Sequence, residues 1–203
     1  MFLNYNQPFY KSALTMDLDI IGIEPYKAFV KKMFEDYGRQ IDDEAVEFVY
    51  YLMSGNTFGM QETMKELFMM TEGKACVGRE DAVAATLTIL KRHDEEYREL
   101  INRVTKTKDR KLLYCIAKEG IAKGLTSAGM LKKYGLDNAS SVQHSLKNLM
   151  NESMPLVQKL SKQAYMLQDR NFELWLSLKA GDIYGKFENP EERYKTERGL
   201  TAE

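Results

Sequence analysis

Eight polar and basic side chains in the second half of the chain have the types and the spacing for binding chemistry. Half of them lie on one predicted helix and half are lysines around it. Hydroxyl and imidazole groups can hydrogen-bond to base edges in a DNA groove, whereas lysines contact phosphates. The candidates are Ser140, Ser141, His144 and Lys147 on the helix, and Lys132, Lys133, Lys159 and Lys162 around it. No arginine lies on this helix, so the set predicts contact with phosphates more strongly than reading of a base sequence.

Charge is distributed unevenly along the chain, although the formal net charge is -1. Between Lys106 and Arg170 there are twelve lysines and arginines against five acidic residues, a net of +7 that leaves -8 for the remainder. A basic segment beside an acidic remainder favours contact with a polyanion such as double-stranded DNA. The alternative is a solvated, lysine-rich surface, or one that binds a protein partner.

Three helices are predicted within the basic segment. The first is "KDRKLLYCIAKEG", and the second, "TSAGMLKKYG", begins at the cap-forming Thr126 or Ser127 and ends at Gly135. Asp137 or Asn138 caps the third. The apolar stripes expected to face inward are Leu112, Leu113, Ile116 and Ala117 on the first helix, Ala128, Leu131 and Tyr134 on the second, and Ala139, Val142, Leu146 and Leu149 on the third.

Two short strand patterns follow the third helix. "LVQKLSK" and "QAYMLQD" are joined near Ser161 to Gln163, and Pro155 marks the break after the helix. Three helices followed by a β-hairpin is the order of a winged helix, in which the third helix enters the major groove and the hairpin forms the wing. We therefore expect residues 106–180 to form a winged-helix domain with a helix-turn-helix.

The first half of the chain carries helical patterns. "EPYKAFVKKMFEDYG", "DDEAVEFVYYLMSG" and "GMQETMKELFMM" each place apolar residues three and four apart, and a fourth helix is expected from Arg79 to Val104. Residues 23–105 are therefore predicted to form a helical bundle. Together with the winged helix, this bundle makes the expected fold class mainly α, with one small β-hairpin.

Both ends of the chain depart from these patterns. "MDLDIIGI", from Met16 to Ile23, alternates apolar and acidic residues with the period of a strand, yet no neighbouring segment offers a partner strand. Because a single strand cannot satisfy its own backbone hydrogen bonds, we expect residues 1–22 to belong to a sheet outside this chain. Residues 181–203, which include "KFENPEERYKTERGLTAE", are expected to form a polar tail that is solvated or disordered.

Four stretches, taken in order, resemble the C-terminal part of the archaeal-type ATPase family, a branch of the AAA+/STAND P-loop NTPases. "QPFYKSALTMDLDII" is similar to the segment that leads into the last strand of the ATPase core, and "GNTFGMQETMKELF" is similar to the helix motif of the lid. "LTSAGMLKKYGLDNASSVQHSLKNLM" resembles the family's winged-helix core, and "AYMLQDRNFELWL" resembles its closing pattern. The four stretches cover most of residues 7–178.

This resemblance implies a helical lid at residues 23–105 and a winged helix after it. In an intact relative, the lid positions that match Asn56, Thr57 and Gln61 would face the nucleotide. Thr57 and Arg170 stand where the family usually has proline. The resemblance also implies that residues 1–22 are a remnant of an ATPase core, and that this core is a partner of the chain.

Catalysis of nucleotide hydrolysis is not expected of this chain. It has no G-x-x-x-x-G-K-[ST] loop and no upstream strand ending in acidic residues, the parts with which intact family members hold ATP and Mg²⁺. We therefore expect neither a catalytic residue nor a cofactor. The favoured interpretation is the non-catalytic C-terminal region of an ATP-binding, AAA-type ATPase. The alternative is a stand-alone winged-helix transcription regulator whose helical half dimerises.

Other kinds of site and location find little support. His93 and His144 lie on different predicted helices without nearby cysteines or paired acids, so we expect no zinc or hydrolytic site. Cys76 and Cys115 are each expected to be a small buried residue. No apolar run approaches the ~20 residues of a membrane span, and the N-terminus lacks the features of a signal peptide, so we expect no membrane contact and a cytoplasmic location.

Overall fold

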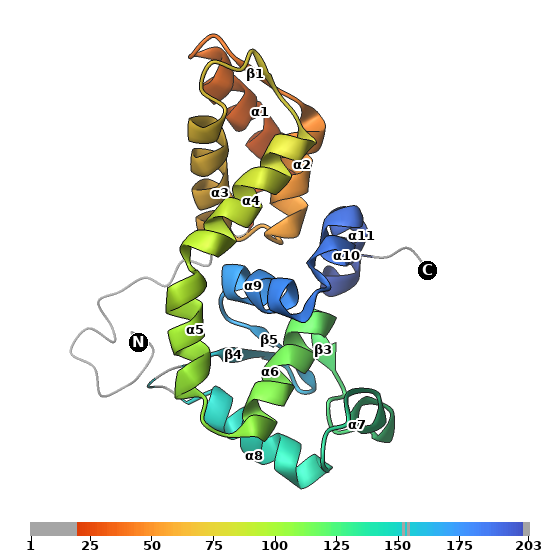
Figure 1. Ribbon diagram of the computed structural model, residues 1–203. Helices are drawn as coiled ribbons and strands as arrows, with labels where there is room; N and C mark the ends of the chain where they lie inside the picture. The colour runs from red at the N-terminus through yellow and green to blue at the C-terminus, as the bar shows by residue number, and fades with distance from the viewer. Residues whose placement is uncertain (1–19, 152, 154, 201–203) are drawn as a thin grey trace, which may run out of the picture.

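The structure is a computed structural model that describes residues 20–151, 153 and 155–200. Figure 1 shows two halves, a helical bundle and a part that contains the small sheet, with α9 between them. The helices of the first half are α1 (Ile23–Glu35), α2 (Asp43–Leu52), α3 (Thr57–Met70) and α4 (Arg79–Arg92), followed by α5 (Asp94–Arg103). The mainly α fold with a small β-hairpin, expected from the sequence, is confirmed.

Helix α2 lies at the centre of the bundle and packs against α1, α3 and α4. Two short parallel strands, β1 (Gln40–Ile41) and β2 (Cys76–Val77), join the connections that precede α2 and α4. The expectation that both cysteines are buried is wrong for one of them. Cys115 is buried, but Cys76 is exposed on the two-residue strand β2, where its thiol donates to Asp42 Oδ1 at 3.3 Å.

The long helix expected over residues 79–104 is interrupted at His93. The backbone of this residue (φ -86°, ψ 7°) separates α4 from α5. Its imidazole is held by two carboxylates, with Nε2 2.8 Å from Glu62 Oε1 and Nδ1 3.0 Å from Glu96 Oε2. Burial by itself would lower the pKa of His93, but the two carboxylates outweigh it and raise that pKa. The apolar spacing continues across the break, which is why the sequence pattern did not reveal it.

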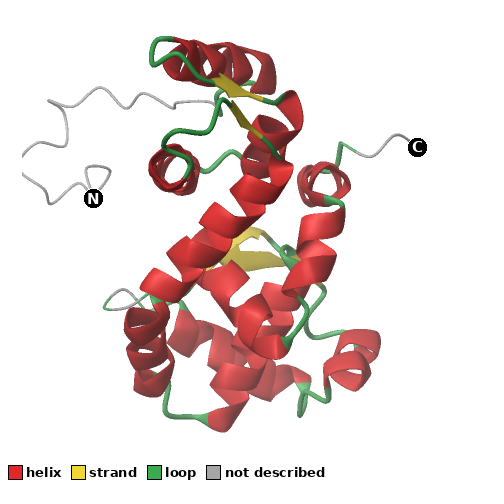
Figure 2. Cartoon of the chain, turned by 45° about the horizontal axis from the view of Figure 1, so that its top comes forward, coloured by secondary structure: helices red, strands yellow, loops and turns green. Residues whose placement is uncertain are grey.

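The second half of the molecule contains the three helices and the hairpin in the expected order. The hairpin strands pair antiparallel, and a further strand pairs with the second of them, so the sheet order is β3-β5-β4. Figure 2 shows the small sheets in yellow among the red helices. The elements are α6 (Thr107–Glu119), β3 (Ala122–Lys123), α7 (Ala128–Tyr134), α8 (Ala139–Leu149), β4 (Val157–Ser161) and β5 (Ala164–Leu167). Strand β3 was not predicted, since two residues are too few to show an alternating pattern.

Cap residues set the boundaries of α7 and α8 as expected. Ser127 Oγ accepts a hydrogen bond from the backbone N–H of Met130 at 3.3 Å, and Asn138 Oδ1 accepts one from the N–H of Ser141 at 2.9 Å. Between the two helices Gly135 adopts φ +56°, a left-handed conformation that glycine tolerates best. The turn between α7 and α8 is therefore short and fixed.

The apolar stripes are buried to different degrees. The stripe of α6 is buried as predicted, and so are Val142, Leu146 and Leu149 of α8. The expectation for α7 is wrong at Ala128, which is exposed, whereas Leu131 and Tyr134 are half-buried and pack against the core. With seven residues, α7 packs along one edge and covers little of its neighbours. Ala139, at the start of α8, is also exposed rather than part of the inner stripe.

Helix α9 (Arg170–Ala180) joins the two halves through a shared core. It packs against α4 on one side and α6 on the other (Figure 1). Two hydrogen bonds tie it to α5: Trp175 Nε1 donates to Asp94 Oδ1 at 2.9 Å, and Tyr97 Oη donates to Asp169 Oδ2 at 3.1 Å. One continuous cluster of buried apolar residues therefore runs through both halves.

Residues 183–198 fold as helices, so the expectation of a solvated or disordered tail is wrong for this segment. Helix α10 (Ile183–Glu188) packs on α9, and α11 (Pro190–Arg198) packs on α2. Ile183 and Phe187 enter the core. The composition is polar because much of the inner side of this segment consists of charged residues that pair with one another.

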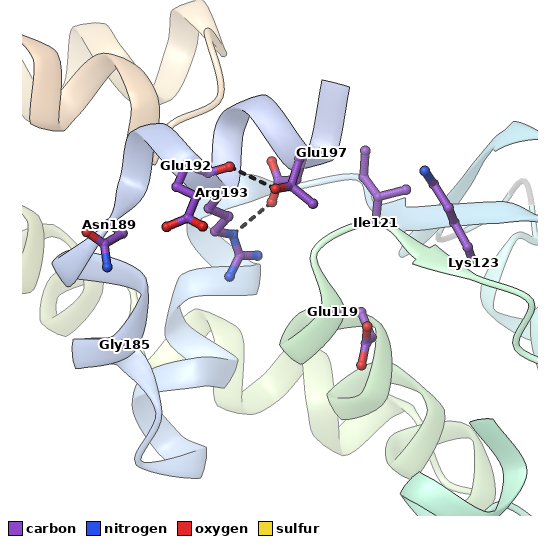
Figure 3. A pocket seen from close by; sticks show the side chains of 9 residues that line it. Glu119, Ile121, Lys123, Gly185, Asn189, Glu192, Arg193 and Glu197 are labelled. Carbon is purple, nitrogen blue, oxygen red and sulfur yellow. Dashed lines mark hydrogen bonds and ion pairs between the residues drawn. The ribbon is translucent and has the colours of Figure 1, made fainter. Parts of the chain in front are cut away.

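A network of buried ions holds this segment in place. Glu173 is fully buried and binds three cations, with Arg170 Nη1 at 2.8 Å, Lys186 Nζ at 2.7 Å and Arg193 Nη2 at 2.6 Å. Glu197 binds Arg193 Nε at 2.8 Å, as Figure 3 shows, and Arg170 Nη1 at 3.3 Å. Since removing one partner of a buried ion pair leaves an uncompensated charge, the members of this network depend on one another.

The same network reaches both halves of the molecule. Ser54, just after α2, donates its hydroxyl to Glu197 Oε2 at 2.6 Å, and Lys186 Nζ donates to the carbonyl of Ala117 on α6 at 2.6 Å. Gly120 ends α6 at φ +74°, and a side chain at this position would collide with Glu197. The two C-terminal helices, α10 and α11, therefore connect the bundle to the winged-helix part.

Lys186 makes a testable contribution to the pH dependence of stability. Burial lowers its pKa to about 8, against the attraction of Glu173. A lysine in the unfolded chain titrates near ~10.4, so between these values the unfolded state binds more protons than the folded state. The free energy of unfolding should therefore rise with pH from about 7.5 to about 9, by up to ~1.4 kcal/mol per pH unit, in urea titrations. At higher pH the rise is opposed, because burial raises the pKa of the Cys115 thiol to about 12.

The matched variants for this test are Lys186→Met and Lys195→Met. Lys195 lies on α11 with its side chain 49% exposed, so its loss should leave the rise unchanged. Lys186→Met should abolish the rise, since no titrating ammonium remains in the buried network. Equal pH profiles for wild type and Lys186→Met would show that another group is responsible.

One sequence expectation falls partly outside the described residues. Residues 16–19, half of the predicted strand Met16–Ile23, lie there. In the described half the strand prediction is wrong, because Ile20 to Gly22 belong to no helix or strand and Ile23 begins α1. The boundaries expected at residues 22, 105 and 180 stay predictions. Throughout the described residues, no helix combines the length and the apolar character that crossing a membrane requires.

Candidate nucleic-acid interface

Helix α8 presents a polar face to solvent and an apolar face to the core. Ser140, His144 and Lys147 are exposed, as their helical spacing predicted. Gln143 is exposed on the same face, between the positions of Ser140 and Lys147, and the same spacing could have identified it. All the side chains of the exposed face can donate hydrogen bonds, and those of Ser140, Gln143 and His144 can also accept them.

Ser141 has a different position from the other candidates on α8. It is half-buried, its hydroxyl donates to Asp137 Oδ2 at 3.3 Å, and its backbone N–H is bound by the cap Asn138. These contacts make Ser141 part of the start of the helix. It fixes where α8 begins rather than projecting with the exposed face.

The candidate lysines lie on several elements. Lys147 is on α8, Lys132 on α7, Lys159 on β4 and Lys162 in the turn between β4 and β5, and all four are exposed. Within the described part of the chain, none of these four forms an ion pair. Lys133 is different, because its Nζ lies 2.6 Å from Glu119 Oε1 on α6. Four of the five predicted lysines are thus placed to meet phosphates without breaking an internal contact.

A buried carboxylate fixes the rotation of α8 relative to α6. Asp109, on α6, is 4% exposed. Its Oδ1 accepts a hydrogen bond from Ser145 Oγ at 2.5 Å, and its Oδ2 accepts one from Asn148 Nδ2 at 2.9 Å. Ser145 and Asn148 are three residues apart on the inner side of α8, so the pair of bonds sets which residues face outward.

Replacement of Asp109 by alanine should destabilise the protein by roughly 1 to 3 kcal/mol, because Ser145 and Asn148 would lose their buried acceptor. Urea unfolding followed by circular dichroism measures this change. Glu72→Ala, at an exposed acidic residue outside the winged helix, is the control and should change stability by less than about 0.5 kcal/mol. Similar values for the two variants would contradict the role of Asp109.

The residues expected to face a nucleotide lie at the start of α3. Asn56, Thr57 and Gln61 are all exposed. The side chain of Asn56 is used within the fold, since its Oδ1 accepts a hydrogen bond from the N–H of Gly59 at 2.9 Å and caps the helix. Thr57 occupies the first position of α3, where the proline usual in the family would also be tolerated.

Comparison with known proteins identifies one domain. Residues 95–178 match the family model described as "Probable winged helix domain". The match begins in α5 and ends in α9, so it includes α6, α7, α8 and the three-stranded sheet. No curated protein and no solved structure matches the chain. The chain therefore contains a winged-helix domain, a class that binds DNA or proteins.

Proposed function

We propose that the winged-helix domain binds duplex DNA, with α8 in the major groove and the wing against the backbone. The observation that carries the proposal is the division of α8 into an exposed polar face and a buried apolar face. The major groove is ~12 Å wide and admits such a helix. The exposed face offers Ser140, Gln143 and His144 for base edges, and among these Gln143 has the two-pronged amide that suits adenine.

Phosphate contacts would supply most of the affinity. The segment from Lys106 to Arg170 has a net charge of +7. Four of its exposed lysines lie on α8 or on the elements that precede and follow it in the chain. Each neutralised phosphate releases counterions from the DNA, so affinity should depend steeply on salt. The exposed lysines that we assign to phosphates are Lys132, Lys147, Lys159 and Lys162.

Fluorescence anisotropy with a labelled duplex, titrated with the chain at several salt concentrations, tests this proposal. Four phosphate contacts predict a slope of roughly -4 for the logarithm of the association constant against the logarithm of the salt concentration. A slope near zero, or no binding at low salt, would reject DNA as the ligand. The same face would then be assigned to a protein partner, because winged helices also serve as protein-binding modules.

We infer further that the chain is the non-catalytic C-terminal part of an ATP-binding protein, with residues 23–105 as a helical lid. The support is the order of four stretches that resemble the archaeal-type ATPase family and the exposure of Asn56, Thr57 and Gln61 at the start of α3. A preceding or adjacent coding segment with a P-loop would support this proposal, and this chain by itself should not bind labelled ATP. Tight ATP binding by the chain by itself would overturn the assignment.

The stand-alone regulator is the competing proposal. In that case no P-loop protein accompanies the chain, and the helical half joins two copies. A dimer would favour the stand-alone regulator. The exposed surface of α1 is therefore relevant to the choice between the two proposals.

A further inference from the structure

The described residues leave an apolar face uncovered on α1 and on the turn that follows it. Phe29 and Met33 on α1 and Tyr37 in the turn directly after it follow one another at intervals of four residues and are 61%, 44% and 67% exposed. Val30 and Phe34, on the adjoining side of the helix, are buried in the bundle. Large apolar side chains gathered on one exposed face are typical of an interaction site rather than of ordinary surface.

Charged residues of both signs flank this apolar face. Lys32 on α1 and Asp36, the residue that caps its C-terminus with helical backbone angles, are both exposed. They lie four residues apart on the same side and form no ion pair with another described residue. A partner for this face must therefore present apolar side chains together with an acid and a base in the opposite order. A second copy of α1, running antiparallel, has this arrangement.

We propose that α1 forms a homodimer interface in which it packs antiparallel against α1 of a second copy. In a two-fold symmetric pair, contacts are reciprocal, so Lys32 meets Asp36 of the partner subunit and Asp36 meets the partner's Lys32. A parallel pair would instead bring the lysines together and the aspartates together. The order of the charges therefore selects the antiparallel arrangement.

The apolar residues require nearly the same register as the charges. Pairing of the two charged residues centres the symmetry axis at position 34, and pairing of Phe29 with the partner's Tyr37, in the turn after the helix, centres it at position 33. One residue of helix is about 1.5 Å, which side chains of this length accommodate. The apolar contacts and the ion pairs are thus compatible within a single interface.

The exposed apolar surface extends beyond α1. The ring of Tyr37 lies 5.2 Å from that of Phe68 on α3, and Met69 beside it is 61% exposed. Tyr37, Phe68 and Met69 line one hollow at the end of the bundle. A stable interface buries roughly 800 Å² on each partner, and the α3 residues widen the surface of α1 toward that size.

This inference does not depend on DNA binding, but it has a consequence for it. A symmetric dimer carries two winged helices and would read two half-sites related by the same symmetry. A palindromic duplex with two half-sites would then bind more tightly than a duplex of equal length that contains only one half-site.

Sedimentation equilibrium of the full 203-residue chain, between about 5 and about 100 µM, tests the interface. We expect a dimer. Lys32→Asp and Asp36→Lys should each raise the dimer dissociation constant by at least about tenfold, because each change makes two symmetry-related repulsions. The double variant Lys32→Asp/Asp36→Lys should restore the wild-type constant, since the charges meet again in reversed order.

Tyr37→Ser should also weaken the dimer, and Tyr184→Ser is its matched control. Tyr184 lies on α10 and is 64% exposed, close to the value for Tyr37, so its loss should leave the dissociation constant unchanged. Circular dichroism confirms that each variant is folded before its sedimentation is measured. A wild type that stays monomeric over the whole range, or a double variant no tighter than the single ones, would overturn the proposal.

Discussion

The double variant Lys147→Glu/Lys162→Glu is expected to bind duplex DNA roughly fiftyfold more weakly than the wild type at ~0.1 M salt. Each phosphate contact adds ~0.9 to the salt slope, which corresponds to about eightfold in affinity at this salt concentration. Loss of two contacts should therefore also reduce the slope from roughly -4 to roughly -2. Because Lys147 and Lys162 are exposed and form no ion pair with described residues, the fold should be retained.

The control for this variant has the same net charge at another place. Lys65 on α3 and Lys91 on α4 are exposed and lie outside the winged helix. Lys65→Glu/Lys91→Glu should leave the salt slope unchanged and reduce affinity only slightly. If the two double variants lose affinity equally, DNA is attracted by the overall charge of the protein, and the assignment of α8 and the wing fails.

Replacement of Glu173 by glutamine is expected to lower the free energy of unfolding by about 3 to 5 kcal/mol, because it leaves buried cations without their shared anion. Arg170, Lys186 and Arg193 all bind this one carboxylate. Burial by itself would raise the pKa of Glu173, but the three cations outweigh it and lower the pKa to about 2. The ionised carboxylate is therefore the form that stabilises the fold.

Urea unfolding over a range of pH measures both parts of this prediction. The carboxylate's contribution should be fully present above the unfolded pKa of ~4.3 and be lost as pH falls toward the folded value. Glu173→Gln should be much less sensitive to acid in this range. Glu191→Gln removes a half-exposed ion pair with Lys195 at 2.7 Å and should cost less than about 1 kcal/mol. Comparable losses in the two variants would contradict the central place of Glu173.

Local signals were sufficient to predict the winged helix. Apolar spacing placed α6 and α8, and Gly135 marked the turn. The cap-forming pairs Thr126/Ser127 and Asp137/Asn138 marked where α7 and α8 begin to within one residue. The polar face of α8 followed from the same spacing, since residues on one side of a helix share an environment. These features depend on neighbours within a few positions, which a sequence displays directly.

Features made by distant residues could not be predicted in this way. Asp109 meets Ser145 across 36 positions, and Lys133 meets Glu119 across 14. The charged residues of α11 were predicted to form a solvated tail because composition does not reveal that Arg193 pairs with the buried Glu173 and with Glu197. The break at His93 was hidden for a related reason, since its carboxylate Glu62 comes from another helix.

The bond between Ser54 and Glu197 joins positions 143 residues apart. Helix α2, made early in synthesis, is covered by α11, which leaves the ribosome among the last elements of this chain. Until then one side of α2 lacks its native cover and is open to chaperones or to association with other nascent chains. Although each helix could form in microseconds, closing so large a loop should make the completed protein a slow folder for its helical content.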